Sequence, residues 1–356
     1  SYNANNKNTF TQDGVTYALT LDGASVNTFP SKGMYRADVT CENATGKWLY
    51  DEWVLAIEDI NGDNITCDID FTTISKTNLN TYITGLSGTE QGDGQVVQEN
   101  GYRYEGKNPN NYVWFNNEPW RIIGVFDEAS HGQSGQNLVK IIRADSLGGL
   151  ARHKSNTNDW TASSLMNLLN GAYLNAEDGT DSGYCYGYST TVPSNCDYTS
   201  IGISATYRSM IANAKWYLGG SSSNNATAEA FYGYERGTTV YSRRPTEWEG
   251  KIGLMYPSDY GYSVLARSCA RTTILSSYNK STCAGESWLY GQGYEWTITP
   301  RSSSSSSVFL VANPGGYLST NSAYDGCSAR PSLYLASSVY VIDGNGSMSD
   351  PYIIGM

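Results

Sequence analysis

The chain has 356 residues, a formal net charge of −11 at pH 7 and no cluster of lysine or arginine residues. Because nucleic acids and anionic membrane surfaces are bound through basic patches, this charge argues against both as partners. Charged residues make up 16% of the chain, and its polarity comes instead from serine, asparagine, threonine, glycine and 29 tyrosines, as in secreted, β-rich binding proteins.

The first part of the chain is predicted to be an all-β domain over residues 10–86, preceded by a flexible or partner-bound arm over residues 1–9. Apolar residues alternate in GVTYALTLDG, which indicates a strand that ends in a turn. YRADVTCENATGKW adds another strand, and WVLAIEDINGDNITCDIDF reads as two strands joined by a hairpin turn at residues 61–64. We therefore expect an Ig-like β-sandwich here.

A calcium loop is the competing interpretation of this turn. Asp59, Asn61, Asp63 and Asp70 partly match the spacing of calcium ligands. Asn64 stands where such a loop needs glycine for its sharp turn, and the flanking segments are strands. The pattern therefore favours a hairpin, and we predict no metal.

A Gly- and Gln-rich linker is expected over residues 87–101, followed by a second domain over residues 102–356. This domain opens with a β-meander, predicted as strands at 112–115, 120–126 and 138–145.

Two helices follow in the prediction. One covers residues 161–174 with Thr161 as its N-cap, and the other runs from near Ser204 to residues 219–220. Short apolar strands are then predicted at residues 251–257, 295–300, 307–312, 331–336 and 338–343. Strands, helices and then many short strands indicate an α+β fold with an irregular antiparallel sheet.

Six of the seven cysteines form close-spaced pairs, which predicts three local disulfides and an oxidising compartment. The expected pairs are Cys41 with Cys67, Cys185 with Cys196, and Cys269 with Cys283. Cys327 is left over. No Cys/His spacing indicates zinc, and we expect no cofactor. No apolar run approaches 18 residues, so no membrane insertion is expected, and any secretion signal was removed before Ser1.

Several blocks, in order, resemble a known family. They are YVWFNNEPWRIIGVFD, WTASSLMNLLNGAYL, GKIGLMYPSDYGYS, WLYGQGYEWTITPRS and the C-terminal ARPSLYL and VYVIDGNGSMSDPYII. Together they resemble secreted C-type-lectin-fold proteins of gut Firmicutes, akin to the formylglycine-generating-enzyme group. The resemblance implies that residues 102–356 form a C-type-lectin-like domain with two helices and a loop-rich binding surface.

Residues 302–329 further resemble the variable region of proteins diversified by retroelements. Such systems mutate adenines at AAY codons, which cannot then encode Lys, Glu, Gln, Met or Trp, and the segment contains none of these residues. The resemblance makes Cys327 a chance product of diversification. The competing interpretation is an exposed low-complexity loop without a ligand.

Side chains suited to adaptable contact occur throughout this segment, between apolar strands that would anchor it. The predicted ligand-binding residues are Ser304, Ser306, Asn313, Tyr317, Ser319, Asn321, Tyr324, Asp325 and Ser328.

Catalytic residues are not predicted. His131 and His153 have no nucleophile motif beside them, and Glu247 and Glu249 flank Trp248 in a predicted strand. We predict an extracellular or cell-surface adhesion protein that binds a protein or glycan on another cell, phage or host. The alternatives are a structural subunit of a surface filament or pilus, assembled by strand exchange, and a secreted carbohydrate-active enzyme.

Overall fold

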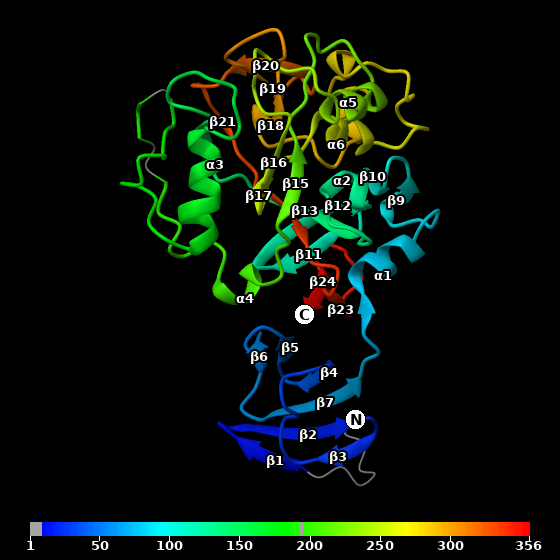
Figure 1. The fold of residues 1–356 in the computed structure, drawn as a ribbon. Coiled ribbons are helices and arrows are strands. Elements are labelled where there is room, and N and C mark those ends of the chain that lie inside the picture. The colour runs from blue at the N-terminus through cyan, green and yellow to red at the C-terminus, as the bar shows by residue number, and fades with distance from the viewer. Residues whose placement is uncertain (1–8, 189, 193–194) are drawn as a thin grey trace. The chain divides into compact units, whose positions relative to one another are not determined.

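A computed structural model describes residues 9–188, 190–192 and 195–356, so most of the predicted arm at residues 1–9 lies outside the described residues. The fold is α+β and rich in strands, as predicted (Figure 1). The chain forms two compact units. The first comprises residues 1–77, 340–344 and 353–355, and the second comprises residues 78–339, 345–352 and 356.

The first unit is built on a five-stranded sheet with the order β1-β2-β7-β4, in which β3 also pairs with β2. Its strands are β1 (Thr9–Gln12), β2 (Val15–Leu21), β3 (Ala24–Val26), β4 (Tyr35–Glu42) and β7 (Ile65–Thr73). A separate two-stranded sheet joins β5 (Thr45–Leu49) to β6 (Val54–Glu58). The C-terminal strands β23 (Tyr340–Asp343) and β24 (Tyr352–Gly355) pair with each other.

The predicted hairpin between β6 and β7 is wrong, because these strands belong to different sheets. The turn between them is held by the β4–β5 turn instead of closing on itself. The Asn43 carbonyl accepts a hydrogen bond from the Asn61 amide at 2.8 Å, and Asn43 Nδ2 donates to the Asn64 carbonyl at 2.8 Å. The turn therefore carries the chain from one sheet to the other.

The core of the first unit is formed by the apolar residues that alternate along its strands, as the sequence pattern predicts. Tyr17, Leu19, Ile69 and Phe71 are buried, and the Trp48 ring meets Phe71 edge-on at 5.0 Å. The Cys41–Cys67 disulfide links residues that are directly opposite in β4 and β7.

The second unit contains a large sheet whose strands follow the order β17-β22-β13-β12-β11, with β10 pairing to β12 and β9. Their bounds are β9 (Gly92–Gln98), β10 (Tyr102–Pro109), β11 (Tyr112–Phe115), β12 (Glu118–Phe126), β13 (Leu138–Arg143), β17 (Ile252–Gly253) and β22 (Ser332–Leu335). The segment predicted as a linker, residues 87–101, therefore contains β9, whose Val96 is buried.

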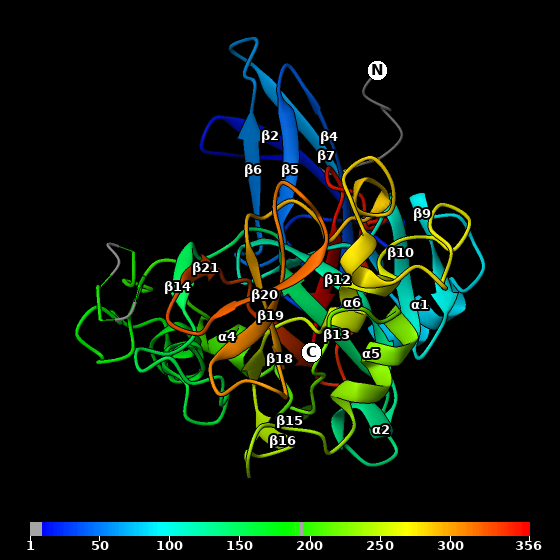
Figure 2. The ribbon, with the colours of Figure 1, turned by 90° about the horizontal axis from the view of Figure 1, so that it is seen from above.

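A smaller sheet of the second unit has the order β14-β21-β18-β19-β20. Its strands are β14 (Gly149–Ala151), β18 (Glu295–Pro300), β19 (Ser307–Val311), β20 (Leu318–Ser322) and β21 (Gly326–Ser328). Helices α5 and α6 lie beside this sheet in both views (Figure 1; Figure 2). The remaining strands are β8 (Thr77–Asn78) and the pair β15 (Ala214–Tyr217) and β16 (Glu247–Gly250).

The helices are short. They are α1 (Leu79–Gly85), α2 (Glu128–His131), α3 (Ser164–Leu168), α4 (Ala205–Arg208), α5 (Ala228–Glu235) and α6 (Pro257–Tyr262), with a π-helical turn at Leu169–Tyr173 and 3₁₀ turns at Leu275–Ser277 and Ala284–Glu286.

The helix predicted over residues 161–174 exists, but Ser163 is its N-cap. The Ser163 hydroxyl accepts a hydrogen bond from the Met166 amide, whereas the hydroxyl of Thr161 donates to Asp159. The helix predicted from Ser204 ends at Arg208, because residues 214–217 pair with β16 as a strand. The strand predicted over residues 251–257 is limited to Ile252–Gly253, and the chain then enters α6 at Pro257.

One buried carboxylate joins three elements of the second unit. Asp259, near the start of α6, accepts hydrogen bonds from Arg103 Nη1 of β10 at 2.9 Å and from Lys140 Nζ of β13 at 2.6 Å. It also accepts from the Tyr256 amide at 2.9 Å, which caps the helix. All three charged side chains are at most 2% exposed.

Burial by itself would raise the pKa of Asp259, but the charges of Lys140 and Arg103 lower it to about 2. Burial lowers the pKa of Lys140 to about 8, against the attraction of Asp259. At neutral pH the carboxylate is therefore ionised between two cations, and losing it would leave both cations uncompensated in the interior.

We expect Asp259→Asn to lower the free energy of unfolding by about 3–5 kcal/mol, because it leaves two buried cations without a counter-charge. Denaturant unfolding followed by tryptophan fluorescence measures this. The matched control is Asp350→Asn, at an exposed position of the same unit, and it should change little. Equal effects of the two substitutions would contradict the role assigned to Asp259.

Candidate functional site

The segment predicted to bind a ligand, residues 302–329, is part of the smaller sheet. We call it the binding segment. It supplies β19, β20 and β21, and β19 pairs with β20 along its whole length from Ser307↔Ser322 to Val311↔Leu318. Val308, Leu310 and Leu318 are buried. The binding segment, whose sequence has no clear periodicity, is therefore an ordered part of the fold.

The run of serines forms a turn over residues 301–307, here called the serine turn. One side chain binds three of its carbonyls: Asn158 Nδ2 donates to the carbonyls of Arg301, Ser304 and Ser307 at 3.1, 2.9 and 2.8 Å. Asn158 is completely buried, and Arg244 Nη2 adds a bond of 2.6 Å to the Ser305 carbonyl. These contacts are to the backbone, so they do not require serine at any position.

The loop between β19 and β20 is held in the same way. The Tyr260 hydroxyl donates to the Gly316 carbonyl at 2.6 Å, and the Tyr290 hydroxyl donates to the Pro314 carbonyl at 2.7 Å. Gly316 has a φ of +84°, and a Cβ there would lie 2.3 Å from Ala284, so both the backbone angle and the space require glycine.

The strand β20 and the turn after it are also bound through their carbonyls. Asn224 Nδ2 donates to the Leu318 carbonyl at 2.9 Å, and the His153 amide donates to the Ala323 carbonyl at 2.8 Å. Side chains and amides from outside the binding segment therefore fix the path of its backbone.

Most of the predicted ligand-binding side chains make few contacts with this frame. Tyr317 is 41% exposed and the others are partly exposed. Within the described residues, no hydrogen bond is made by the side chains of Ser306, Tyr317, Ser319, Asp325 and Ser328.

The other predicted side chains have local partners. Ser304 Oγ accepts from the amides of Ser306 and Ser307, and Asn313 Oδ1 accepts from the Tyr290 hydroxyl at 3.3 Å. Asn321 Nδ2 lies 3.8 Å from Cys327 Sγ. Asn313, Asn321 and Tyr324 contact residues outside the predicted set, and a side-chain contact within the set joins Ser304 to Ser306.

Two tyrosines outside the binding segment lie next to it. Tyr188 is 54% exposed, and its ring meets Tyr324 edge-on at 5.2 Å. Tyr294 is 51% exposed and precedes Glu295, which lies opposite both Val311 and Ser328. Neither residue could be found from the local pattern, because contacts between distant parts of the chain bring them here: Tyr188 packs on Tyr324, and Tyr294 precedes the residue that pairs with Ser328.

The three predicted disulfides form, and Cys327 is a free, buried thiol. Burial raises the pKa of Cys327 to about 12, so the residue is a neutral thiol at physiological pH. The buried thiol packs in the sheet and is not available as a nucleophile.

The residues weighed for catalysis do not converge. His131 is buried, its Nε2 lies 3.0 Å from the Phe126 carbonyl, and burial lowers its pKa. Glu247 pairs with Lys215 at 3.0 Å on the two-stranded β15–β16 sheet. In the described part of the chain, no group of three or more His, Cys, Asp or Glu residues could hold a metal ion.

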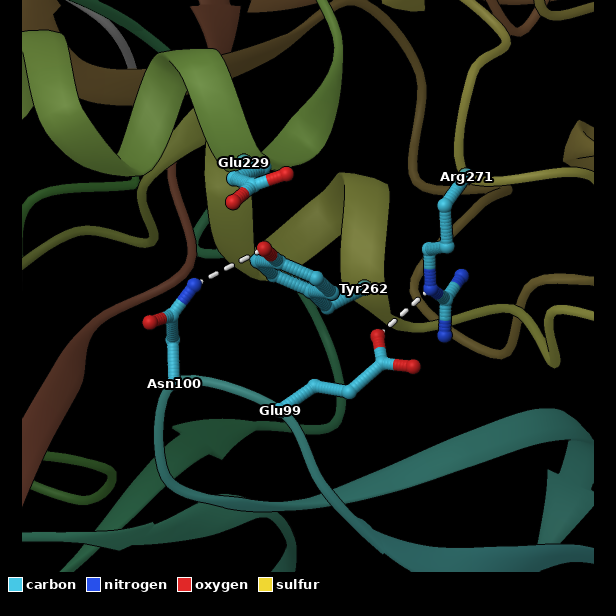
Figure 3. Close-up of a pocket in the computed structure, with 5 residues that line it drawn as sticks. All are labelled: Glu99, Asn100, Glu229, Tyr262 and Arg271. Carbon is cyan, nitrogen blue, oxygen red and sulfur yellow. Dashed lines mark hydrogen bonds and ion pairs between the residues drawn. The ribbon is translucent and has the colours of Figure 1, made fainter.

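A polar cavity of about 260 Å³ lies elsewhere in the second unit and is shown in Figure 3. Its lining residues are Glu99, Asn100, Glu229, Tyr262 and Arg271. The Tyr262 hydroxyl accepts from Asn100 Nδ2 at 2.9 Å, and Glu229 lies close to this hydroxyl (Figure 3). None of these residues was predicted, because they come from parts of the chain that are distant in sequence. Glu99 and Asn100 lie in the β9–β10 turn, Glu229 lies in α5 and Tyr262 in α6, and Arg271 lies in the loop closed by the Cys269–Cys283 disulfide.

Arg271 uses three of its five N–H donors on partners around this cavity. Its guanidinium binds Glu99 at 2.5 Å, Glu105 at 2.5 Å and the Val264 carbonyl at 2.8 Å. Glu105 is 1% exposed, and burial raises its pKa to about 8 despite the charge of Arg271. The cavity wall therefore depends on a carboxyl that takes up a proton near physiological pH.

We expect Asn158→Ala to lower the free energy of unfolding by about 1–3 kcal/mol, because buried carbonyls lose their donor. Hydrogen exchange should increase at the amides of residues 301–307. Ser306→Ala, in the same turn, should stay within about 0.5 kcal/mol of the wild type. The interpretation fails if the two variants are equally stable.

The raised pKa of Glu105 predicts a pH dependence. The folded state holds this proton up to about pH 8 while the unfolded chain releases it near 4.5, so stability falls as pH rises across that range. Glu105→Gln should reduce the slope of the unfolding free energy against pH between these values. Glu90→Gln, at an exposed site, should keep the wild-type slope, and an unchanged slope in Glu105→Gln would contradict the assignment.

Comparison with known proteins gives no match to a family model, to a curated protein or to a solved structure. Along the described stretches of the chain, no helix is both long and apolar enough to cross a membrane. The resemblance to C-type-lectin-fold proteins therefore stays a prediction, and the function has to be argued from the site.

Proposed function

We propose that the second unit is a ligand-binding module of an extracellular protein and that the binding segment forms its contact surface for a protein or glycan. The observation that carries the proposal is how this segment is held. Asn158, Tyr260, Tyr290 and Asn224 bind its backbone carbonyls, while several of its own side chains form no hydrogen bond with any described residue. A surface built this way can change its side chains without losing its shape.

The side chains on this surface suit recognition. Tyr317 and Tyr324, together with Tyr188 and Tyr294, offer large, rigid rings that lose little entropy on binding. Ser319, Asp325 and Ser328 offer hydrogen-bonding groups that no described residue occupies. This combination fits adhesion better than catalysis, which would require converging acid, base or nucleophile groups.

The three disulfides support an oxidising, extracellular environment for this binding. A C-type-lectin-like fold for the second unit, and diversification of residues 302–329 by a retroelement, are the finer parts of the proposal. They rest on the sequence resemblance and on the hydrogen bonds that hold this segment through its backbone carbonyls.

Binding is tested by applying the purified chain to a glycan array and to a displayed library of bacterial surface proteins. For the strongest target, the double variant Tyr317→Ala/Tyr324→Ala should bind at least about tenfold more weakly, because exposed tyrosines are common hot spots. Its melting temperature should stay at the wild-type value.

The matched control is Tyr234→Ala/Tyr241→Ala, which removes two comparably exposed tyrosines from outside the binding segment. It should bind as the wild type does. If the control variant loses binding and the Tyr317/Tyr324 variant keeps it, the binding segment is not the contact surface and the proposal is wrong.

A further inference from the structure

Beneath the serine turn, several buried N–H groups have no acceptor. Arg152 Nε, Trp160 Nε1 and Arg244 Nη1 are each buried and unpartnered within the described chain. Arg152 is 0% exposed and Trp160 is 1% exposed. Buried donors without a partner are rare in folded proteins and commonly mark a bound water or ion.

Contacts and charge link the residues that carry these donors: Arg152 packs against Trp160, and the Arg244 charge acts on Arg152. The Arg152 guanidinium lies 4.9 Å from the centre of the Trp160 ring, and its Nη1 and Nη2 bind the Thr297 and Ile298 carbonyls of β18. Arg244 binds the Ser305 carbonyl of the serine turn, which Asn158 holds from the same loop that carries Trp160. Arg152 is therefore bound to β18, and Arg244 is bound to the serine turn.

The charge in this region is unbalanced. The charge of Arg244 acts on Arg152, and Arg152 forms no ion pair among the described residues. One carboxylate, Asp159, acts on both arginines, and its Oδ1 accepts from the amide and hydroxyl of Thr161. Burial lowers the pKa of both arginines, the charge of Asp159 opposes this shift in both, and the Arg244 charge lowers the pKa of Arg152 further. A buried positive charge of this kind is costly without a counter-ion.

We propose that this region binds a small monovalent inorganic anion such as chloride, held by the unpartnered N–H groups of Arg152, Trp160 and Arg244. An anion accepts hydrogen bonds from all three donors and balances the excess guanidinium charge, which water alone does not. Asn158 Oδ1 is also unpartnered, and a water bound to the anion can donate to it. The partly exposed Arg244 leaves a route from solvent.

A bound anion would stabilise the conformation of the serine turn, because Asn158 and Arg244 belong to the proposed site and also bind carbonyls of the turn. The site does not depend on the proposed function, because the binding segment can recognise its ligand whether or not an anion is bound.

The test compares sodium chloride with sodium gluconate at constant ionic strength, using thermal unfolding of the full chain and ³⁵Cl NMR line width. Chloride should raise the melting temperature and broaden the ³⁵Cl signal. Arg244→Gln and Trp160→Phe should each weaken the apparent chloride affinity about tenfold or more, because each removes one N–H donor to a charged group. Trp160→Phe keeps a ring beneath Arg152.

Arg243→Gln is the matched control. Arg243 is the exposed residue next to Arg244 in the sequence, so this substitution removes the same charge at a position outside the proposed site. It should respond to chloride as the wild type does. In crystals soaked in bromide, an anomalous peak should lie within hydrogen-bond distance of Arg152 Nε and Trp160 Nε1. Equal stability in chloride and gluconate, or an equal chloride response in Arg244→Gln, would overturn the proposal.

Discussion

The buried carboxylate of Asp259 is the constraint on which the second unit depends. It fixes α6 against β10 and β13 through Arg103 and Lys140, and the next residue in α6 is Tyr260. The Tyr260 hydroxyl in turn holds the Gly316 carbonyl of the binding segment. A charge cluster in the core therefore sets the position of a loop on the surface through one short, rigid helix.

The frame around the binding segment separates shape from side-chain identity. Backbone carbonyls are the same at every residue, so a donor such as Asn158 holds the serine turn whatever side chains the turn carries. Glycine at position 316 is an exception, since both its φ and its close neighbour exclude other residues. This arrangement links the ordered fold to a surface that can vary, which is the physical basis for proposing a recognition function.

Local patterns predicted much of this structure. Period-two alternation located β2, and short apolar runs located β13, β18 and β19, because burial on a sheet imposes these patterns. The helix predicted from near Ser204 to residues 219–220 fails over residues 214–217, because Trp216 pairs across β15 and β16, a long-range contact that overrides local propensity. Tyr188, Tyr294 and the cavity at Tyr262 were missed for the same reason: chain segments distant in sequence bring them into place.

The central claim is that the frame tolerates side-chain variation in the binding segment, and a pair of displayed libraries tests it most directly. One library randomises Ser306, Tyr317, Ser319, Asp325 and Ser328, and the other randomises Asn158, Asn224, Tyr260 and Tyr290, with resistance to protease measured for every variant. The account predicts that most members of the first library match the wild type and most of the second do not. Equal losses in both libraries would contradict it.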